Sequence, residues 1–215
     1  MVAVAAAGLL AGAFADHRSD LRAERPRTRV AARRTVAALV CAAACVSVFA
    51  ARGATLASLQ YVLLMIVACA ASLYDLKARI VPNAFVASAV AVRLLFCLLS
   101  PSRLFSLLWS VLGGAVVLAP ALLVVLVMDR RTGRSNMGGG DLKLFFAVGM
   151  YVPWQQGLLL LVAACLFGVL GALVSGRGRV SAAQTVPFAP SIALATWLTV
   201  LVGGPVLAWY TGLFL

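Results

Sequence analysis

Residues 106–128 read SLLWSVLGGAVVLAPALLVVLVM and contain no charged side chain. A helix that crosses the hydrocarbon core of a bilayer needs about 20 predominantly apolar residues, so this run is long enough to span a membrane. Similar apolar runs occupy approximately residues 1–15, 36–51, 56–74, 84–100, 141–152, 157–174 and 188–212. The sequence therefore predicts an all-α fold, a polytopic membrane bundle of about seven to eight transmembrane helices.

The composition of the whole chain indicates the same class of protein. Hydrophobic residues make up 64% of the 215 positions, and the mean hydropathy of +1.06 exceeds what a soluble domain can bury. The net charge of +12 could suggest nucleic acid, but the basic residues fall in short loops and form no groove interleaved with aromatic residues. We expect a lipid bilayer, and no nucleic acid, as their partner.

The basic residues also predict an orientation. They crowd the first, third, fifth and seventh loops, whereas the even-numbered loops offer only Arg52 and Arg103. Because cytoplasmic loops carry an excess of Lys and Arg, the odd-numbered loops are predicted to be cytoplasmic.

Two aspartates lie where an apolar run meets a polar loop. Asp75 follows the third run, and Asp141 opens the sixth run directly after the glycines at 138–140. Each begins an Asp-Leu-Lys triplet, which ends at Lys77 or Lys143. The predicted orientation places both carboxyl groups on the cytoplasmic face. Ionisable residues in such positions of a membrane protein are a functional-site hypothesis.

Each aspartate also has a structural interpretation. Asp141 could cap the helix that it starts, because a helix N-terminus favours an anion. The carbonyl end of a helix disfavours the charge of Asp75, although Lys77 and Arg79 could neutralise it. Asp129 also ends an apolar run, but two arginines follow it at once, and we interpret it as a solvated interface residue.

Two carboxyl groups that approach each other can hydrolyse a peptide bond. Mutual repulsion and desolvation keep one protonated and the other ionised, so one can activate water while the other polarises the carbonyl. The one histidine of the sequence, His17, lies in the arginine-rich first loop, and the five cysteines include no CxxC pair. We therefore expect aspartic protease chemistry with no metal and no other cofactor.

Three motifs of this sequence resemble those of the prepilin peptidases, the bacterial membrane aspartic proteases that process type IV pilin precursors. Residues 138–144, GGGDLKL, match the family signature GxGD-x-K-L. Asp75, followed downstream by IVPN at 80–83, is similar to the other catalytic aspartate with its Pro-Asn ending. Residues 186–190, VPFAP, resemble a Pro-Phe-Gly-Pro element in which Ala189 replaces glycine. The resemblance covers roughly residues 56–205.

The resemblance implies an endopeptidase of a bacterial inner membrane that removes the leader of a prepilin-like membrane precursor at the cytoplasmic face. It implies Asp75 and Asp141 as the catalytic pair. The shared proton is assigned to neither, because a coupled pair titrates as a unit. It also implies a set of residues for substrate binding or structural support: Lys77, Pro82, Asn83, Gly138, Gly139, Gly140, Lys143, Pro187, Phe188 and Pro190.

The resemblance further divides the chain into two parts. Residues 1–55 would hold N-terminal apolar segments with a basic cytoplasmic loop, and residues 56–215 the peptidase-like domain. Full-length members carry paired CxxC zinc motifs in the first loop, where this sequence has no cysteine. The implied form is a peptidase without methyltransferase activity. A small proton-coupled transporter and a noncatalytic membrane scaffold are the alternative functions.

Overall fold

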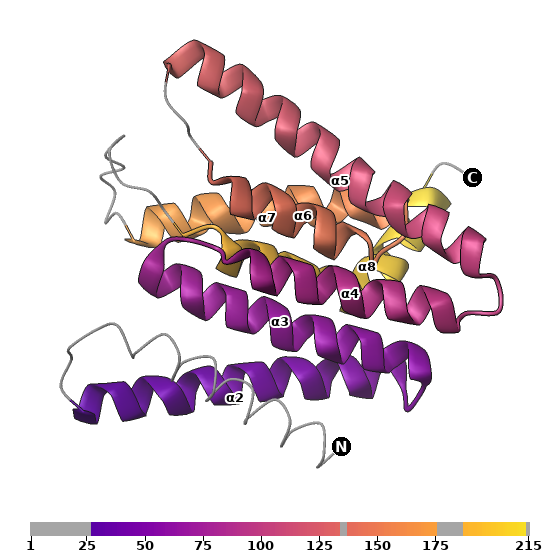
Figure 1. Ribbon diagram of the computed structural model, residues 1–215, viewed down its shortest axis with the longest axis horizontal. Helices are drawn as coiled ribbons and strands as arrows, with labels where there is room; N and C mark the ends of the chain where they lie inside the picture. Colours follow the sequence, from indigo (N-terminus) through magenta and orange to yellow (C-terminus); the bar gives the residue numbers. More distant parts are fainter. Residues whose placement is uncertain (1–26, 134–136, 176–186, 214–215) are drawn as a thin grey trace.

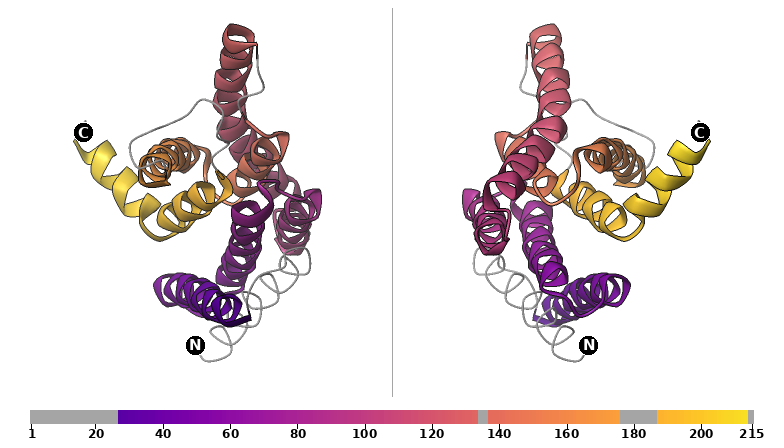
Figure 2. Two further views of the ribbon diagram at one scale, coloured as in Figure 1. Left: turned by 90° about the vertical axis from the view of Figure 1, so that its left-hand side faces the viewer. Right: turned by 90° about the vertical axis from the view of Figure 1, so that its right-hand side faces the viewer.

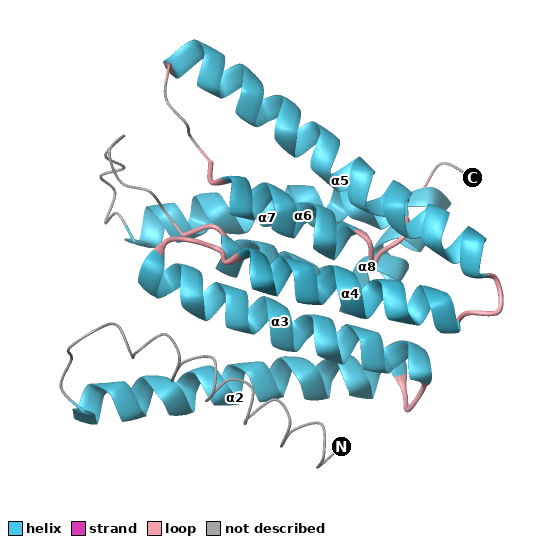
Figure 3. Cartoon of the chain, in the orientation of Figure 1, coloured by secondary structure: helices cyan, strands magenta, loops and turns pink. Residues whose placement is uncertain are grey.

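The described part of the chain is built almost entirely from α-helices. The computed structural model describes residues 27–133, 137–175 and 187–213, and this part of the chain contains no strand (Figure 3). Its helices are α2 (Arg27–Arg52), α3 (Leu56–Ala78), α4 (Asn83–Leu99), α5 (Arg103–Thr132), α6 (Gly139–Gly149), α7 (Trp154–Ser175) and α8 (Ala189–Gly212). The predicted run at residues 1–15 and the loop containing His17 lie outside the described residues.

The predicted class, an all-α polytopic membrane bundle, is confirmed. Five of the described helices, α2, α3, α5, α7 and α8, are long and apolar enough to cross a membrane, and α4 is a shorter apolar helix. The chain is therefore a multi-pass membrane protein. Since α2 packs against both α3 and α8 in one bundle, the division at residue 55 stays a prediction.

Successive helices run in opposite directions, so their connections gather at two ends of the bundle (Figure 1). We call one the aspartate end: it holds the last turns of α3, α5 and α7 and the first turns of α4, α6 and α8. The other, the arginine end, holds the connections α2–α3, α4–α5 and α6–α7. Viewed along the bundle, α5 and the C-terminal part of α8 extend away from the remaining helices (Figure 2).

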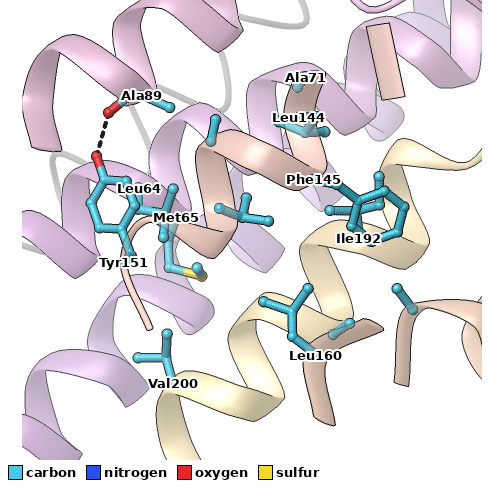
Figure 4. Close-up of a cluster of buried hydrophobic side chains, with 14 of the residues drawn as sticks. Leu64, Met65, Ala71, Ala89, Leu144, Phe145, Tyr151, Leu160, Ile192 and Val200 are labelled. Carbon is cyan, nitrogen blue, oxygen red and sulfur yellow. Dashed lines mark hydrogen bonds between the residues drawn. The ribbon is translucent and has the colours of Figure 1, made fainter. Parts of the chain in front are cut away.

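The short helix α6 lies at the centre of the packing. Its side chains Leu144 and Phe145 are buried among residues of the surrounding helices, including Leu64 of α3 and Ile192 of α8 (Figure 4). Small residues bring α5 against it: a Cβ atom on Gly113 would lie 2.6 Å from the carbonyl oxygen of Gly149. Such close backbone approach is typical of helix packing in membranes.

Two helix starts differ from the sequence prediction. Helix α2 begins at Arg27 rather than near residue 36, so arginines that we predicted in the first loop belong to the helix. Arginine is a good helix former, and apolarity alone does not reveal such an extension. Helix α6 begins at Gly139, so two of the three glycines form its first turn rather than a flexible connection.

Two helix ends also differ. Helix α3 continues to Ala78, which places Asp75 in its last turn. The C-cap residue after it is Arg79, which has a left-handed backbone (φ 53°). The N–H of Arg79 donates to the carbonyl oxygen of Asp75 at 2.8 Å. Helix α6 ends at Gly149 rather than near residue 152, and the chain turns before α7 begins at Trp154.

Candidate active site

Asp75 is a buried carboxyl group at the aspartate end, with 4% of its surface exposed. The backbone N–H of Ala189 donates a hydrogen bond to its Oδ2 at 3.0 Å. Ala189 is the first residue of α8, so the carboxyl group of Asp75 lies at the N-terminus of that helix. Free N–H groups and the helix dipole stabilise negative charge at this position. Helix α8 thus offsets the unfavourable carbonyl end of α3, which no sequence pattern indicated.

The segment from Pro187 to Pro190 forms the entry to α8. Phe188 is the N-cap residue, and Pro190 occupies one of the first two helical positions, where its missing N–H has no intrahelical partner to lose. The ring of Phe188 packs against that of Phe145, with centroids 5.9 Å apart. It also covers Gly168 of α7, where a Cβ atom would collide with the ring. These contacts fix the position of the first turn of α8.

Asp141 occupies the first turn of α6 and does not cap it. The N-cap residue is Gly138, so Asp141 is not the capping residue, although it lies in the first turn, where the helix dipole favours an anion. Its Oδ1 is buried and has no hydrogen-bond partner in the described part of the chain. Burial, and to a smaller extent the charge of Asp75, raise the pKa of Asp141 to about 6. The two carboxyl groups therefore interact electrostatically.

The glycines before Asp141 have different surroundings. A Cβ atom on Gly140 would lie 2.9 Å from the carbonyl oxygen of Val81, whereas one on Gly139 would meet nothing within 4 Å. A Cβ atom on Gly138 would lie 3.6 Å from Oδ2 of Asp141, an ordinary contact. Only Gly140 must lack a side chain for packing. Its contact with Val81 brings the start of α6 onto the α3–α4 connection.

The remaining predicted residues fall into two groups. Nζ of Lys143 donates a hydrogen bond to Oδ1 of Asn83 at 3.1 Å, which joins α6 to the start of α4, and Pro82 is the N-cap residue of α4. Pro187 is half-buried beside Phe188. Lys77 lies exposed in the last turn of α3. The structure thus joins the two lysine-containing motifs through Lys143 but leaves Lys77 on the outside.

Sequence patterns missed Ser72, which is buried one turn before Asp75 and contacts the same residue of α8. The signal available was its spacing, because residues three apart lie on the same face of a helix. Among the described residues, no group of three His, Cys, Asp or Glu side chains is placed to hold a metal ion.

Comparison with known proteins identifies the region that contains both aspartates. The family model described as the type IV leader peptidase family matches residues 61–173, slightly more than half of the chain. The matched region includes Asp75 and Asp141 but ends before the segment from Pro187 to Pro190. No solved structure matches the chain.

Curated relatives give a consistent comparison. The chain is 30% identical over 143 residues to the prepilin leader peptidase/N-methyltransferase of Stutzerimonas stutzeri. The aligned region covers 66% of this chain and 48% of that protein. It is 35% identical over 117 residues to the protein of the same name from Bacillus subtilis, covering 52% of this chain and 45% of the relative. The chain therefore spans about half the length of the curated relatives that it matches.

Proposed function

The chain belongs to the type IV leader peptidase family, and from this we propose that it cleaves the leader from prepilin-like membrane precursors, with Asp75 and Asp141 as its catalytic pair. The observation that carries the proposal is the shared location of the two carboxyl groups. Two carboxyl groups from different helices lie at the same end of the bundle, and the charge of Asp75 contributes to the raised pKa of Asp141. Such coupling is the property that aspartic proteases use.

The pair supports a hydrolysis with separate acid and base roles. One carboxylate removes a proton from water while the water oxygen adds to the scissile carbonyl carbon, and the other carboxyl group gives its proton to the carbonyl oxygen. The resulting tetrahedral intermediate breaks its carbon–nitrogen bond, and the amine leaves with a proton from the pair. A catalytic acid or base works best when its pKa is near the pH of the reaction. The pKa of Asp141, about 6, is closer to physiological pH than that of an ordinary aspartate.

We propose that the aspartate end faces the cytoplasm of a bacterial inner membrane. Support comes from the distribution of charge: Lys77, Arg79 and Lys143 lie at this end, together with the arginines in the last turn of α5. Cytoplasmic ends of membrane helices carry such an excess of basic residues. Labelling of single cysteines at Lys77 and Arg103 with a membrane-impermeant reagent tests the orientation. Labelling of Lys77→Cys from the outside of intact cells would contradict it.

The substrate that we propose is a membrane precursor whose short leader precedes a hydrophobic helix. The bilayer would hold that helix, so that the scissile bond meets the aspartate end without leaving the membrane surface. Because the first loop contains no cysteine pair, we propose peptidase activity without N-methylation. Mass spectrometry of the new N-terminus tests this, and a methylated product would contradict it.

The test of the catalytic pair is cleavage of a co-expressed pilin-like precursor from the same genome, followed by the shift in gel mobility. We expect Asp75→Asn and Asp141→Asn each to lower the cleavage rate by more than about 10³-fold, because neither carboxyl group can replace the other. Asp129→Asn, which makes the same chemical change in the last turns of α5, is the matched control and should cleave normally. Normal cleavage by either site variant would disprove the assigned pair.

A further inference from the structure

Ser72 and Asp75 hold the same residue of α8 from one face of α3. The Ser72 hydroxyl is placed to donate to the carbonyl oxygen of Ala189 at 3.2 Å and to that of Ala68 at 2.7 Å. Oδ2 of Asp75 accepts the N–H of the same Ala189 at 3.0 Å. The donor and the acceptor of one backbone residue are therefore both engaged by side chains three positions apart on α3.

This arrangement determines where the N-terminus of α8 lies relative to Asp75. Phe188 makes no side-chain capping bond, so no side chain of the α8 N-cap competes with Asp75 for the Ala189 N–H. Ser72, with 9% of its surface exposed, and Ala189, with none, leave little room for water to replace their hydrogen bond. The hydroxyl of Ser72 thus holds the α8 N–H groups directed at Asp75.

The two carboxyl groups of the pair have different surroundings. Asp75 receives a backbone N–H at a helix N-terminus, which stabilises its ionised form. Asp141 has a buried Oδ1 with no partner among the described residues. A buried oxygen without a hydrogen bond destabilises a carboxylate far more than a neutral carboxyl group.

From this asymmetry we propose that Asp75 is the ionised member of the pair, that Asp141 carries the proton, and that Ser72 is a positioning residue that keeps the Ala189 N–H on Asp75. The catalytic meaning of this assignment rests on the proposed function. In hydrolysis, Asp75 takes a proton from water as the water oxygen adds to the carbonyl carbon, and Asp141 protonates the carbonyl oxygen. When the carbon–nitrogen bond breaks, Asp75 returns its proton to the amine and Asp141 regains one from the intermediate.

Other charged groups on the neighbouring elements do not reverse the assignment. Lys77 and Arg79 are exposed beyond Asp75, and Lys143 is hydrogen-bonded to Asn83. At the end of α5, Arg130 and Arg131 are exposed and Asp129 is half-buried. The other charged or titratable side chains described on the packed helices are Cys41, Cys45 and Arg52 of α2, Tyr61, Cys69 and Tyr74 of α3, Arg93 and Cys97 of α4, Arg103 of α5, Cys165 of α7 and Tyr210 of α8.

Infrared spectroscopy of the full chain in lipid nanodiscs tests the proton assignment without requiring any cleavage. Below the Asp141 pKa of about 6, we expect the carbonyl stretching band of a protonated, buried carboxyl group. The band should disappear in Asp141→Asn and persist in Asp75→Asn. Loss of the band in Asp75→Asn alone, or a band unchanged in both variants, would overturn the assignment even if the protein proves to be a peptidase.

The role of Ser72 is tested by the pH profile of kcat/KM for precursor cleavage. In Ser72→Ala, the Ala189 N–H is held less firmly, so Asp75 should bind a proton more tightly. The acid limb of the profile should therefore move up by about one pH unit. Ser72→Thr keeps the hydroxyl and should restore the original limb. A uniform loss of rate with an unmoved limb, or the same shift in Ser72→Thr, would show a merely structural role. Failure of the proposed function would appear separately, as absence of cleavage by the unaltered chain.

Discussion

At the aspartate end, two carboxyl groups lie in the bundle with few partners, whereas at the arginine end the polar side chains are surrounded by acceptors. Nε of Arg93 donates to Oγ of Ser110 at 2.9 Å, and its Nη1 donates to Oε1 of Gln60. Its guanidinium group also lies over the ring of Tyr151, 5.7 Å from the centroid. At Asp141, by contrast, Oδ1 is buried and has no hydrogen-bond partner among the described residues.

The network at the arginine end continues across the bundle. The hydroxyl of Tyr151 donates to the carbonyl oxygen of Ala89 at 2.6 Å (Figure 4). The hydroxyl of Tyr61 donates to the backbone carbonyl oxygen of Tyr151 at 3.2 Å. Nη2 of Arg52 donates to the carbonyl oxygen of Val200 at 2.6 Å. These bonds link α2, α3, α4, α8 and the α6–α7 connection.

This difference in hydrogen bonding suggests that the two ends have different roles, one in stability and the other in catalysis. A polar network with satisfied donors fixes one arrangement of helices. A carboxyl group with one buried oxygen that accepts no hydrogen bond is destabilised in its charged form and therefore exchanges protons nearer neutral pH. We infer that the arginine end holds the bundle together and that the aspartate end leaves one carboxyl oxygen, Oδ1 of Asp141, without a partner among the described residues and available for reaction. Changes at the two ends should then affect different measurements.

Among variants that keep both carboxyl groups, the largest effect should come from Gly140→Ala at the aspartate end. The new Cβ atom would press on the carbonyl oxygen of Val81 and move the first turn of α6, with Asp141, away from Asp75. A displacement of about 1 Å at a catalytic group lowers a rate by about 10²-fold. The rate of precursor cleavage, normalised to the protein level in the membrane, measures this.

Gly139→Ala supplies the comparison for that variant. It adds the same methyl group in the same helical turn, but into open space, so its rate should fall by no more than about threefold. Equal losses in the two variants would show that the contact between Gly140 and Val81 does not set the geometry of the pair.

At the arginine end, Arg93→Met should lower stability rather than the rate of cleavage. It removes the hydrogen bonds to the buried residues Gln60 and Ser110. Ser110 keeps its bond to the carbonyl oxygen of Ser106, but Oε1 of Gln60 loses its donor, which costs about 1–3 kcal/mol. Thermal unfolding in detergent measures the loss. Arg103→Met, which removes an exposed arginine at the same end, should change stability by less than about 0.5 kcal/mol. A folded Arg93→Met protein with strongly impaired cleavage would contradict the separation of the two ends.

The fold and the aspartates were predictable from local patterns, whereas the environment of the site was not. Long apolar runs directly predict spanning helices, and Asp75 and Asp141 are conspicuous in so apolar a sequence. The N–H that Ala189 gives to Asp75 comes from 114 positions away, so no local pattern contains it. Arg93 was missed for the opposite reason, because a single arginine within residues 84–100 barely changes the apolarity of that run.

The next effect concerns the pH at which the aspartate end works. If Asp141 must hold a proton to act as the acid, activity is present below its pKa of about 6 and is lost as the pH rises through that value. For the free enzyme, kcat/KM should then fall about tenfold per pH unit on the alkaline side. A profile that stays flat from the acid range to pH 8 would show that no such proton is required.

The smallest effect should come from the exposed hydrogen bond between Lys143 and Asn83 at the aspartate end. Exposed polar contacts contribute about 0.2–1 kcal/mol, so Lys143→Met and Asn83→Ala should each lower the cleavage rate by about twofold. Since both changes break the same 3.1 Å bond, the double variant should lose no more than either single one. Losses that multiply would mean that the two side chains act separately, for example by each contacting the precursor.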